Sequence, residues 1–186
     1  MNQHSQSSTP LTSSSSPSPI TNKVGASVSP CDPNCVKGIS NLLNDMIRKN
    51  ARKHLPQRKS KFYTLEIPKM SVSDYLSRIV KYTNIEESTL LASVICITSY
   101  IKKTKNILSL NNIHRLLLAS CYINAKFYQD VNFSLKFYAK VGGVSVKELK
   151  ELEVDFYYGI NFALHIEEEI FNQYKKILEA KLKRAI

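Results

Sequence analysis

Residues 112–128 of the chain read NIHRLLLASCYINAKFY. The centre of this stretch, Leu116–Ile123, carries no charge, and its one hydroxyl side chain besides Tyr122 is Ser120. A helix that is apolar on all sides is normally surrounded by other helices. Lys126 follows directly after this apolar centre, and a charge beside a core requires a partner. The stretch therefore predicts a buried central helix and a lysine with a specific role.

The sequence outside this stretch has a helical periodicity almost throughout. Apolar residues recur at i, i+3, i+4 and i+7, and capping patterns separate the runs. We expect a first amphipathic helix near 38–50, a helix opened by Ser71 with Asp74, a helix opened by Asn84 with Glu87, the central helix from Asn111 or Asn112, a short helix ending at Gly142-Gly143, a helix opened by Ser145 with Glu148, and a last helix from Ile166. No alternation of strand and helix patterns and no internal repeat is visible, so the expected fold class is all-α.

Length and composition divide the chain into four parts. The 186 residues, 43% of them apolar, are enough for one domain with its own core and some additional sequence. Ser, Thr and Pro dominate the beginning, which predicts a disordered tail over 1–37. A helix and a basic linker occupy 38–67, the regular domain spans 68–165, and a C-terminal helix fills 166–186.

Several features indicate a soluble intracellular protein. The first residues lack a basic start followed by an apolar block, so no secretory signal is expected. The longest apolar runs are shorter than the roughly 20 residues that cross a bilayer, so no membrane association is expected. Cys31 and Cys35 have no second Cys/His pair nearby, and a structural zinc needs four ligands, so we expect no metal. The nucleus, the cytoplasm or both are the expected locations.

The net charge of +11 is unevenly distributed. Residues 1–70 hold ten basic and three acidic side chains, and one basic cluster runs from Arg48 to Lys61. Such a cluster is compatible with nucleic-acid binding, with nuclear import, with an acidic partner or simply with a solvated linker. The charge pattern leaves these four interpretations open.

Glu153 is misplaced on its own helix. At about 100° per residue, Leu152, Phe156 and Ile160 lie within about 60° of Leu149, and Glu153 lies only about 40° from it. A carboxylate inside an apolar stripe is unfavourable unless a cation reaches it. Lys126, at the end of the buried helix, is the natural partner. The alternative is that Glu153 lies at the edge of the stripe and extends into water.

No catalytic machinery is recognisable in the sequence. The four histidines lack an i, i+4 histidine partner, and Gly142-Gly143 is followed by Val-Ser instead of the Lys-Ser/Thr of a phosphate-binding loop. We therefore expect no catalytic residues, no cofactor and no enzymatic activity.

Several spaced motifs together resemble a cyclin box. They are Ser71-x-x-Asp74-Tyr75-Leu76-x-Arg78-Ile79, residues 112–118, Ala125-Lys126-Phe127, residues 139–144, and Glu148-Leu149-x-x-Leu152-Glu153. Their order over residues 68–165 is similar to that of the P/U-type cyclins, which include the fungal phosphate-signalling cyclins. The resemblance implies a single cyclin box, a five-helix bundle with its third helix at the centre, here flanked by N- and C-terminal helices.

The resemblance also implies a function and a binding site. Cyclins bind and activate a cyclin-dependent serine/threonine kinase in cell-cycle or nutrient and phosphate signalling. In the family, a lysine of the third helix and a glutamate of the fifth face the kinase, and these positions are Lys126 and Glu153. Tyr128, Leu149 and Phe156 would be neighbouring apolar contacts. The sequence departs from the family at Lys102-Lys103, where relatives often carry Asp-Arg, which puts partner contacts at that edge in doubt.

A different class of function remains as an alternative. Cyclin folds also occur in transcription factors, and a nucleic-acid-binding or transcription-associated adaptor would use the segment Arg48–Lys61. The regular domain is only modestly basic, so nucleic acid is the less expected partner.

The Ser/Pro-rich tail contains four proline-directed dipeptides. Proline-directed kinases phosphorylate such pairs, so the candidate phosphosites are Thr9, Ser16, Ser18 and Ser29. A bound kinase of this kind would modify its own regulatory subunit. Any tail of this composition also produces such dipeptides by chance.

Overall fold

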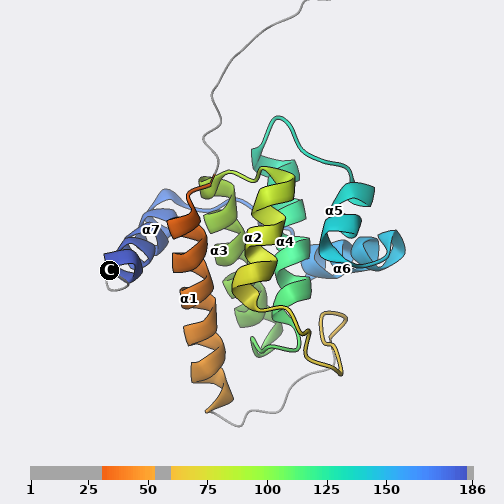
Figure 1. Cartoon of the computed structure of the whole chain (residues 1–186), viewed down its shortest axis with the longest axis horizontal. Helices are drawn as coiled ribbons and strands as arrows, with labels where there is room; N and C mark the ends of the chain where they lie inside the picture. The colour runs from red at the N-terminus through yellow and green to blue at the C-terminus, as the bar shows by residue number, and fades with distance from the viewer. Residues whose placement is uncertain (1–30, 53–59, 184–186) are drawn as a thin grey trace, which may run out of the picture.

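The computed structural model describes residues 31–52 and 60–183. Within these ranges the chain forms seven α-helices and no strand (Figure 1). The helices are α1 (Pro33–Ala51), α2 (Val72–Thr83), α3 (Glu87–Thr104), α4 (Ile113–Tyr128), α5 (Leu135–Gly142), α6 (Val146–Gly159) and α7 (Glu168–Lys183). The all-α fold class is confirmed. None of the helices in the described ranges is long and apolar enough to cross a membrane.

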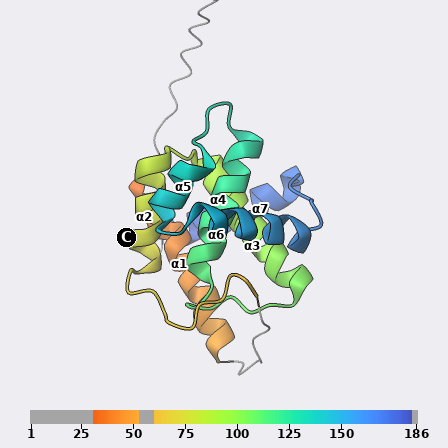
Figure 2. The same cartoon turned by 90° about the vertical axis from the view of Figure 1, so that its right-hand side faces the viewer.

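Helix α4 is the centre of the bundle, as its apolar sequence predicts. It packs against α2, α3, α5 and α6, and α6 crosses in front of it in Figure 2. Every residue of Leu116–Ala125 is buried. The polar groups in this core have partners: the Ser120 hydroxyl donates to the Ser93 carbonyl at 2.8 Å, and the Asn124 amide donates to the Ser120 carbonyl at 2.9 Å. Hydrogen bonding of this kind is what makes burial of polar groups tolerable.

Local capping sets most helix boundaries. The hydroxyls of Ser71 and Ser145 accept hydrogen bonds from the amides of Asp74 and Glu148, each at 3.0 Å, which confirms two predicted caps. Gly143 ends α5 with φ of 71°, a left-handed conformation that glycine adopts without strain. The prediction that Asn84 opens α3 is wrong. Asn84 ends α2 in a left-handed conformation, and Glu86 is the N-cap of α3.

Helix α1 begins earlier than the sequence prediction, at Pro33 instead of near residue 38. The Asp32 carboxylate accepts a hydrogen bond from the Asn34 amide at 2.9 Å, and proline is favourable in a first turn because its missing N–H is not needed there. Cys31 and Cys35 are buried. Residues 31–37 are therefore part of the folded bundle and not of the disordered tail that the composition predicts over 1–37. Residues 1–30 lie outside the described residues.

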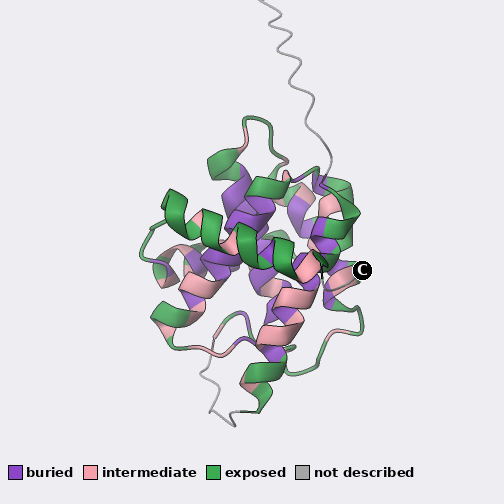
Figure 3. Cartoon of the chain, turned by 90° about the vertical axis from the view of Figure 1, so that its left-hand side faces the viewer, coloured by how far each residue is buried: buried purple, intermediate pink, exposed green. Residues whose placement is uncertain are grey.

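Helices α1 and α7 pack together on one side of the bundle. A Cβ atom at Gly38 would lie 2.7 Å from the Leu178 side chain, so the two helices approach closely at this glycine. Figure 3 shows α7 lying across this side, with exposed residues outward and the buried residues of the bundle behind it. On the opposite side of the molecule α5 and α6 cover α4 (Figure 1).

Candidate functional site

The predicted pair of Lys126 and Glu153 is present. Lys126 lies in the last turn of α4 and Glu153 in the middle of α6, and their Nζ and Oε1 atoms are 2.7 Å apart. The side chain of Lys126 is 40% exposed and that of Glu153 is 14% exposed, so the pair lies at the edge of the core and open to one side. The Lys126 ammonium also lies 5.1 Å from the ring centre of Tyr122.

Glu153 stabilises the charged form of Lys126. Hydrogen bonding to Glu153 raises the pKa of Lys126, with partial burial acting in the opposite direction. Lys126 therefore remains an ammonium group at neutral pH. Because the Lys126 side chain is 40% exposed, water screens the pair, which contributes only about 0–1 kcal/mol to folding. An ammonium group has three donors and a carboxylate accepts several bonds, so both side chains can bind further groups.

Exposed apolar side chains lie next to Lys126 in α4, on α6 and in the turn after α6, and Tyr157 among them interacts electrostatically with both Lys126 and Glu153. We call this group of side chains the aromatic surface and define it by Phe127, Val154, Tyr157, Tyr158 and Phe162. Tyr157 is half-buried, whereas the other four are 45–68% exposed. The ring centres of Tyr157 and Phe162 are 5.7 Å apart in a stacked arrangement. Large exposed aromatic groups are typical of protein–protein interfaces.

Phe162 is held in an unfavourable backbone conformation. Asn161 and Phe162 both have positive φ angles, 54° and 56°, which are uncommon for residues with a side chain. The turn is fixed by hydrogen bonds from the Phe162 amide to the Tyr157 carbonyl at 2.9 Å and from the Lys103 ammonium to the Ile160 carbonyl at 2.7 Å. Residues kept in strained conformations are concentrated at functional sites. The Phe162 ring is 62% exposed, so this turn displays the ring outward.

The sequence prediction missed this turn and most of the aromatic surface. Tyr158 and Val154 are apolar residues that lie outside the apolar stripe of α6. This position in the helical pattern is the signal that could have identified them as exposed. The sequence carries only a weak signal for the left-handed turn at Phe162. Asn161 tolerates a positive φ, but a phenylalanine at the next position argues against one.

Three further residues were predicted as kinase contacts, and two of these predictions are wrong. Leu149 and Phe156 are 0% exposed, and the Phe156 ring stacks on Tyr100 with ring centres 5.2 Å apart. The edge of the Phe62 ring covers Phe156 as well. Helical periodicity cannot reveal a cover supplied by a distant segment. Tyr128 remains available: it is 42% exposed, and its hydroxyl donates to the Leu164 carbonyl at 2.8 Å.

Comparison with known proteins identifies the family. The family model described as Cyclin matches residues 3–164, most of the chain. The chain belongs to the cyclin family. Among the proteins similar to this cyclin, Cyclin-U4-3 of Arabidopsis thaliana is 34% identical over 152 residues, which are 81% of this chain and 69% of the relative. Cyclin-P4-1 of Oryza sativa subsp. japonica is 32% identical over 124 residues, which are 66% of this chain and 58% of the relative.

These relatives are U- and P-type cyclins, which confirms the resemblance to the P/U type. A cyclin is a regulatory protein, and a regulatory role is the function that family membership supports. In the described ranges of this cyclin, no group of three or more His, Cys, Asp or Glu side chains is arranged to hold a metal ion.

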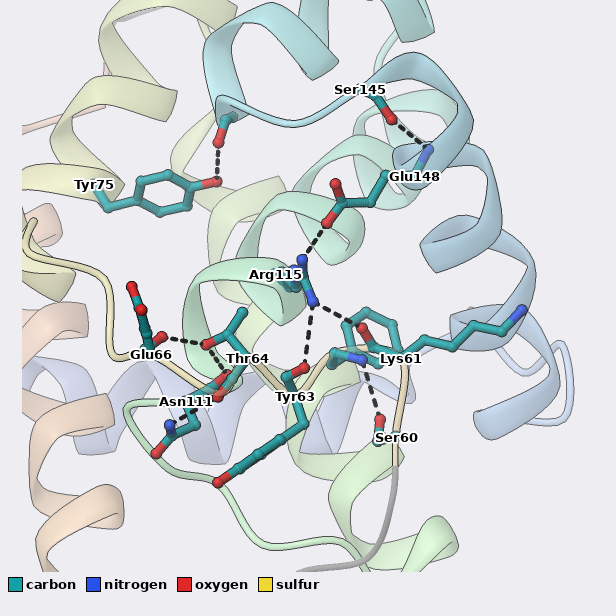
Figure 4. Close-up of polar contacts among 12 residues, drawn as sticks. Ser60, Lys61, Tyr63, Thr64, Glu66, Tyr75, Asn111, Arg115, Ser145 and Glu148 are labelled. Atoms are coloured by element: carbon teal, nitrogen blue, oxygen red, sulfur yellow. Dashed lines mark hydrogen bonds and ion pairs between the residues drawn. The ribbon is translucent and has the colours of Figure 1, made fainter.

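Arg115, near the N-terminal end of α4, has a structural role in this cyclin. Arg115 lies between the segment 60–66 and α6 (Figure 4). Its guanidinium donates to the carbonyls of Lys61 and Tyr63 at 3.2 and 3.3 Å and pairs with the Glu148 carboxylate at 2.5 Å. These bonds hold the segment against the bundle, where Phe62 is fully buried.

The remaining predicted sites are only partly described. Thr9, Ser16, Ser18 and Ser29 lie outside the described residues, as do residues 53–59 of the basic cluster. Arg48 is described, and it pairs with Asp45 on its own helix. The carboxylate of Asp45 also pairs with Lys181 of α7, so this end of the cluster takes part in intramolecular contacts.

Proposed function

We propose that this cyclin binds and activates a cyclin-dependent protein kinase through the aromatic surface and the Lys126–Glu153 pair. The observation that carries the proposal is the pair itself. It joins α4 to α6 at 2.7 Å, yet a pair whose lysine is open to water contributes little to folding. Its position in the cyclin box is the one that the family resemblance assigns to the kinase contact.

The surroundings of the pair support the same conclusion. Interfaces combine a few aromatic anchors with polar groups that become buried on binding. Tyr158 and Phe162 are 68% and 62% exposed and contact each other with ring centres 5.3 Å apart. Burying these rings would provide affinity, while the ammonium and the carboxylate would fix the orientation by bonding to backbone groups of the partner.

Activation follows from differential binding. A kinase exchanges between an active and an inactive arrangement, and its active arrangement requires the pairing of a lysine with a glutamate of its mobile helix. A cyclin shifts this equilibrium only as far as it binds the active arrangement more tightly. In this proposal the chain performs no chemistry and supplies only the contact surface.

The proposal is tested by isolating the full chain from its own cells with its bound proteins. We expect a cyclin-dependent kinase to co-purify and its activity on a protein substrate to increase with added chain. Absence of any kinase, or a bound kinase whose activity does not respond to the chain, would contradict the proposal.

A matched pair of tyrosine variants examines the surface. Tyr158→Ala removes an exposed ring of the aromatic surface, and we expect kinase affinity to fall about 10-fold or more, since tyrosine is common among interface hot spots. Tyr82→Ala removes a ring from α2 that is 49% exposed, and it serves as the control. Surface plasmon resonance with the isolated kinase measures both. Equal affinities of the two variants would place the contact elsewhere.

A further inference from the structure

Gly159, in the last turn of α6, lies directly against α3. A Cβ atom at this position would overlap the Tyr100 ring and lie 3.2 Å from the Thr104 methyl group. The backbone at Gly159 is helical, without a positive φ, and the Ile160 amide donates to the Phe156 carbonyl at 3.0 Å in the same turn. Alanine is normally more favourable than glycine in a helix. The glycine therefore serves a close approach between two helices and not a special backbone conformation.

The Tyr100 ring has no free space into which it could move away from Gly159. The buried ring stacks on Phe156 with ring centres 5.2 Å apart and meets the edge of the Phe62 ring at 5.1 Å. Its hydroxyl donates to the Asp155 carboxylate of α6 at 3.0 Å. Burial raises the pKa of Tyr100 to about 12, so the hydroxyl keeps the proton that it donates at neutral pH. Because interiors are close-packed, a ring held on these sides fixes whatever lies against it.

The last turn of α6 carries part of the aromatic surface. Tyr158 directly precedes Gly159, and the turn that displays Phe162 directly follows α6. The rings of Tyr158 and Phe162 are 5.3 Å apart, and the Phe162 amide donates to the Tyr157 carbonyl at 2.9 Å. A displacement of this last turn would therefore move both exposed rings.

We propose that Gly159 and Tyr100 are positioning residues for the aromatic surface. The Tyr100 ring determines where the last turn of α6 lies, and this turn in turn holds Tyr158 and Phe162 in place. Groups that are already in place before binding give a higher affinity, because little ordering remains to be done in the complex. The effect on kinase affinity rests on the function proposed above, whereas the effect on the two rings does not.

Gly159→Ala in the full chain tests this proposal. The added methyl group overlaps the Tyr100 ring, so the last turn of α6 has to shift. We expect kinase affinity to fall about 10-fold or more in surface plasmon resonance, since displaced aromatic anchors lose most of their binding energy. In the free chain, we expect the nuclear Overhauser contacts between the rings of Tyr158 and Phe162 to weaken several-fold.

The two measurements separate this proposal from the proposed function. Unchanged contacts between the two rings, or an unchanged affinity for a kinase that binds the natural chain, would overturn the positioning role. A natural chain that binds no kinase would contradict the proposed function. The ring contacts of the free chain would then still decide whether Gly159 positions the surface.

Gly38→Ala is the matched control. Gly38 also lies within a helix, and a Cβ atom there would lie 2.7 Å from the Leu178 side chain, between α1 and α7. Within the part of the chain that the structure describes, neither α1 nor α7 contacts α6. We expect Gly38→Ala to change thermal stability only. An equal loss of the Tyr158–Phe162 contacts in both glycine variants would show a general packing effect and overturn the proposal.

Tyr100→Phe is a second variant that keeps the ring and its packing. It removes only the hydroxyl that donates to Asp155, so we expect a folded chain with a several-fold lower kinase affinity and weaker contacts between the rings of Tyr158 and Phe162. If circular dichroism shows that Gly159→Ala is unfolded, Tyr100→Phe decides by the same two measurements. Values equal to those of the natural chain would overturn the proposal.

Discussion

We expect Lys126→Ala and Glu153→Ala each to weaken kinase binding strongly while the chain remains helical and folded. In the free chain the lysine of the pair is open to water, and the pair contributes about 0–1 kcal/mol to folding. In the proposed complex the same pair would be buried, and removing one partner of a buried hydrogen-bonded pair costs about 2–5 kcal/mol. We therefore expect affinity to fall by a factor of roughly 30 to several thousand, since about 1.4 kcal/mol corresponds to tenfold.

The control for this prediction is Glu151→Ala on the same helix. Glu151 is exposed and lies about 200° around α6 from Glu153, on the side that faces solvent. Its removal should leave affinity unchanged in a titration calorimetry experiment. If Lys126→Ala and Glu153→Ala retain the affinity of Glu151→Ala, the surface assignment is wrong.

Exchanging the two charges separates a folding role from a binding role. The double variant Lys126→Glu/Glu153→Lys can still form an ion pair between α4 and α6. If the pair served only the fold, the double variant would bind the kinase as the natural chain does. We expect it to match the natural chain in thermal stability and still fail to bind, because each partner group now meets the wrong charge.

Phe156→Ala has the largest expected effect on stability. The ring is fully buried and contacts the rings of both Tyr100 and Phe62. Truncating such a ring costs about 3–5 kcal/mol through lost burial and the remaining cavity. Chemical denaturation followed by circular dichroism measures the loss, and Tyr158→Ala, which removes an exposed ring from the same helix, should change stability by less than about 1 kcal/mol.

The binding behaviour of the Phe156 variants completes this test. The milder Phe156→Leu keeps the chain folded if the alanine variant unfolds, and folded Phe156→Leu should bind the kinase normally. A variant at Phe156 with unchanged stability and lost binding would show that the side chain belongs to the interface after all.

Local patterns were sufficient to predict the centre of this fold. The apolar run in α4 and the serine caps at Ser71 and Ser145 depend on residues that are near one another in the sequence. The Lys126–Glu153 pair could be predicted because both residues stand out on regular helices. The helical rotation of about 100° per residue places Glu153 inside the apolar stripe of α6, and the unfavourable energy of an unpaired buried charge then requires a cation nearby.

Features that depend on distant segments could not be predicted in the same way. Phe156 has the same position in the helical pattern whether it faces a partner or is covered by Phe62, which comes from an irregular segment more than 90 residues earlier. The start of α1 was missed for a local reason, since Asp32-Pro33 is compatible with both a turn and a capped first turn. The turn at Phe162 depends on a bond from Lys103 of α3.

The hydrogen bond from the Lys103 ammonium to the Ile160 carbonyl gives Lys103 a structural role that the sequence does not suggest. Helix α6 has no basic residue in its own last turn, and the Lys103 ammonium reaches the Ile160 carbonyl at the end of that helix. A cation there stabilises the negative end of the helix dipole from another helix. Among relatives, position 103 should therefore co-vary with the residues of the 160–162 turn. A relative without a basic residue at position 103 should also lack an aromatic residue at position 162.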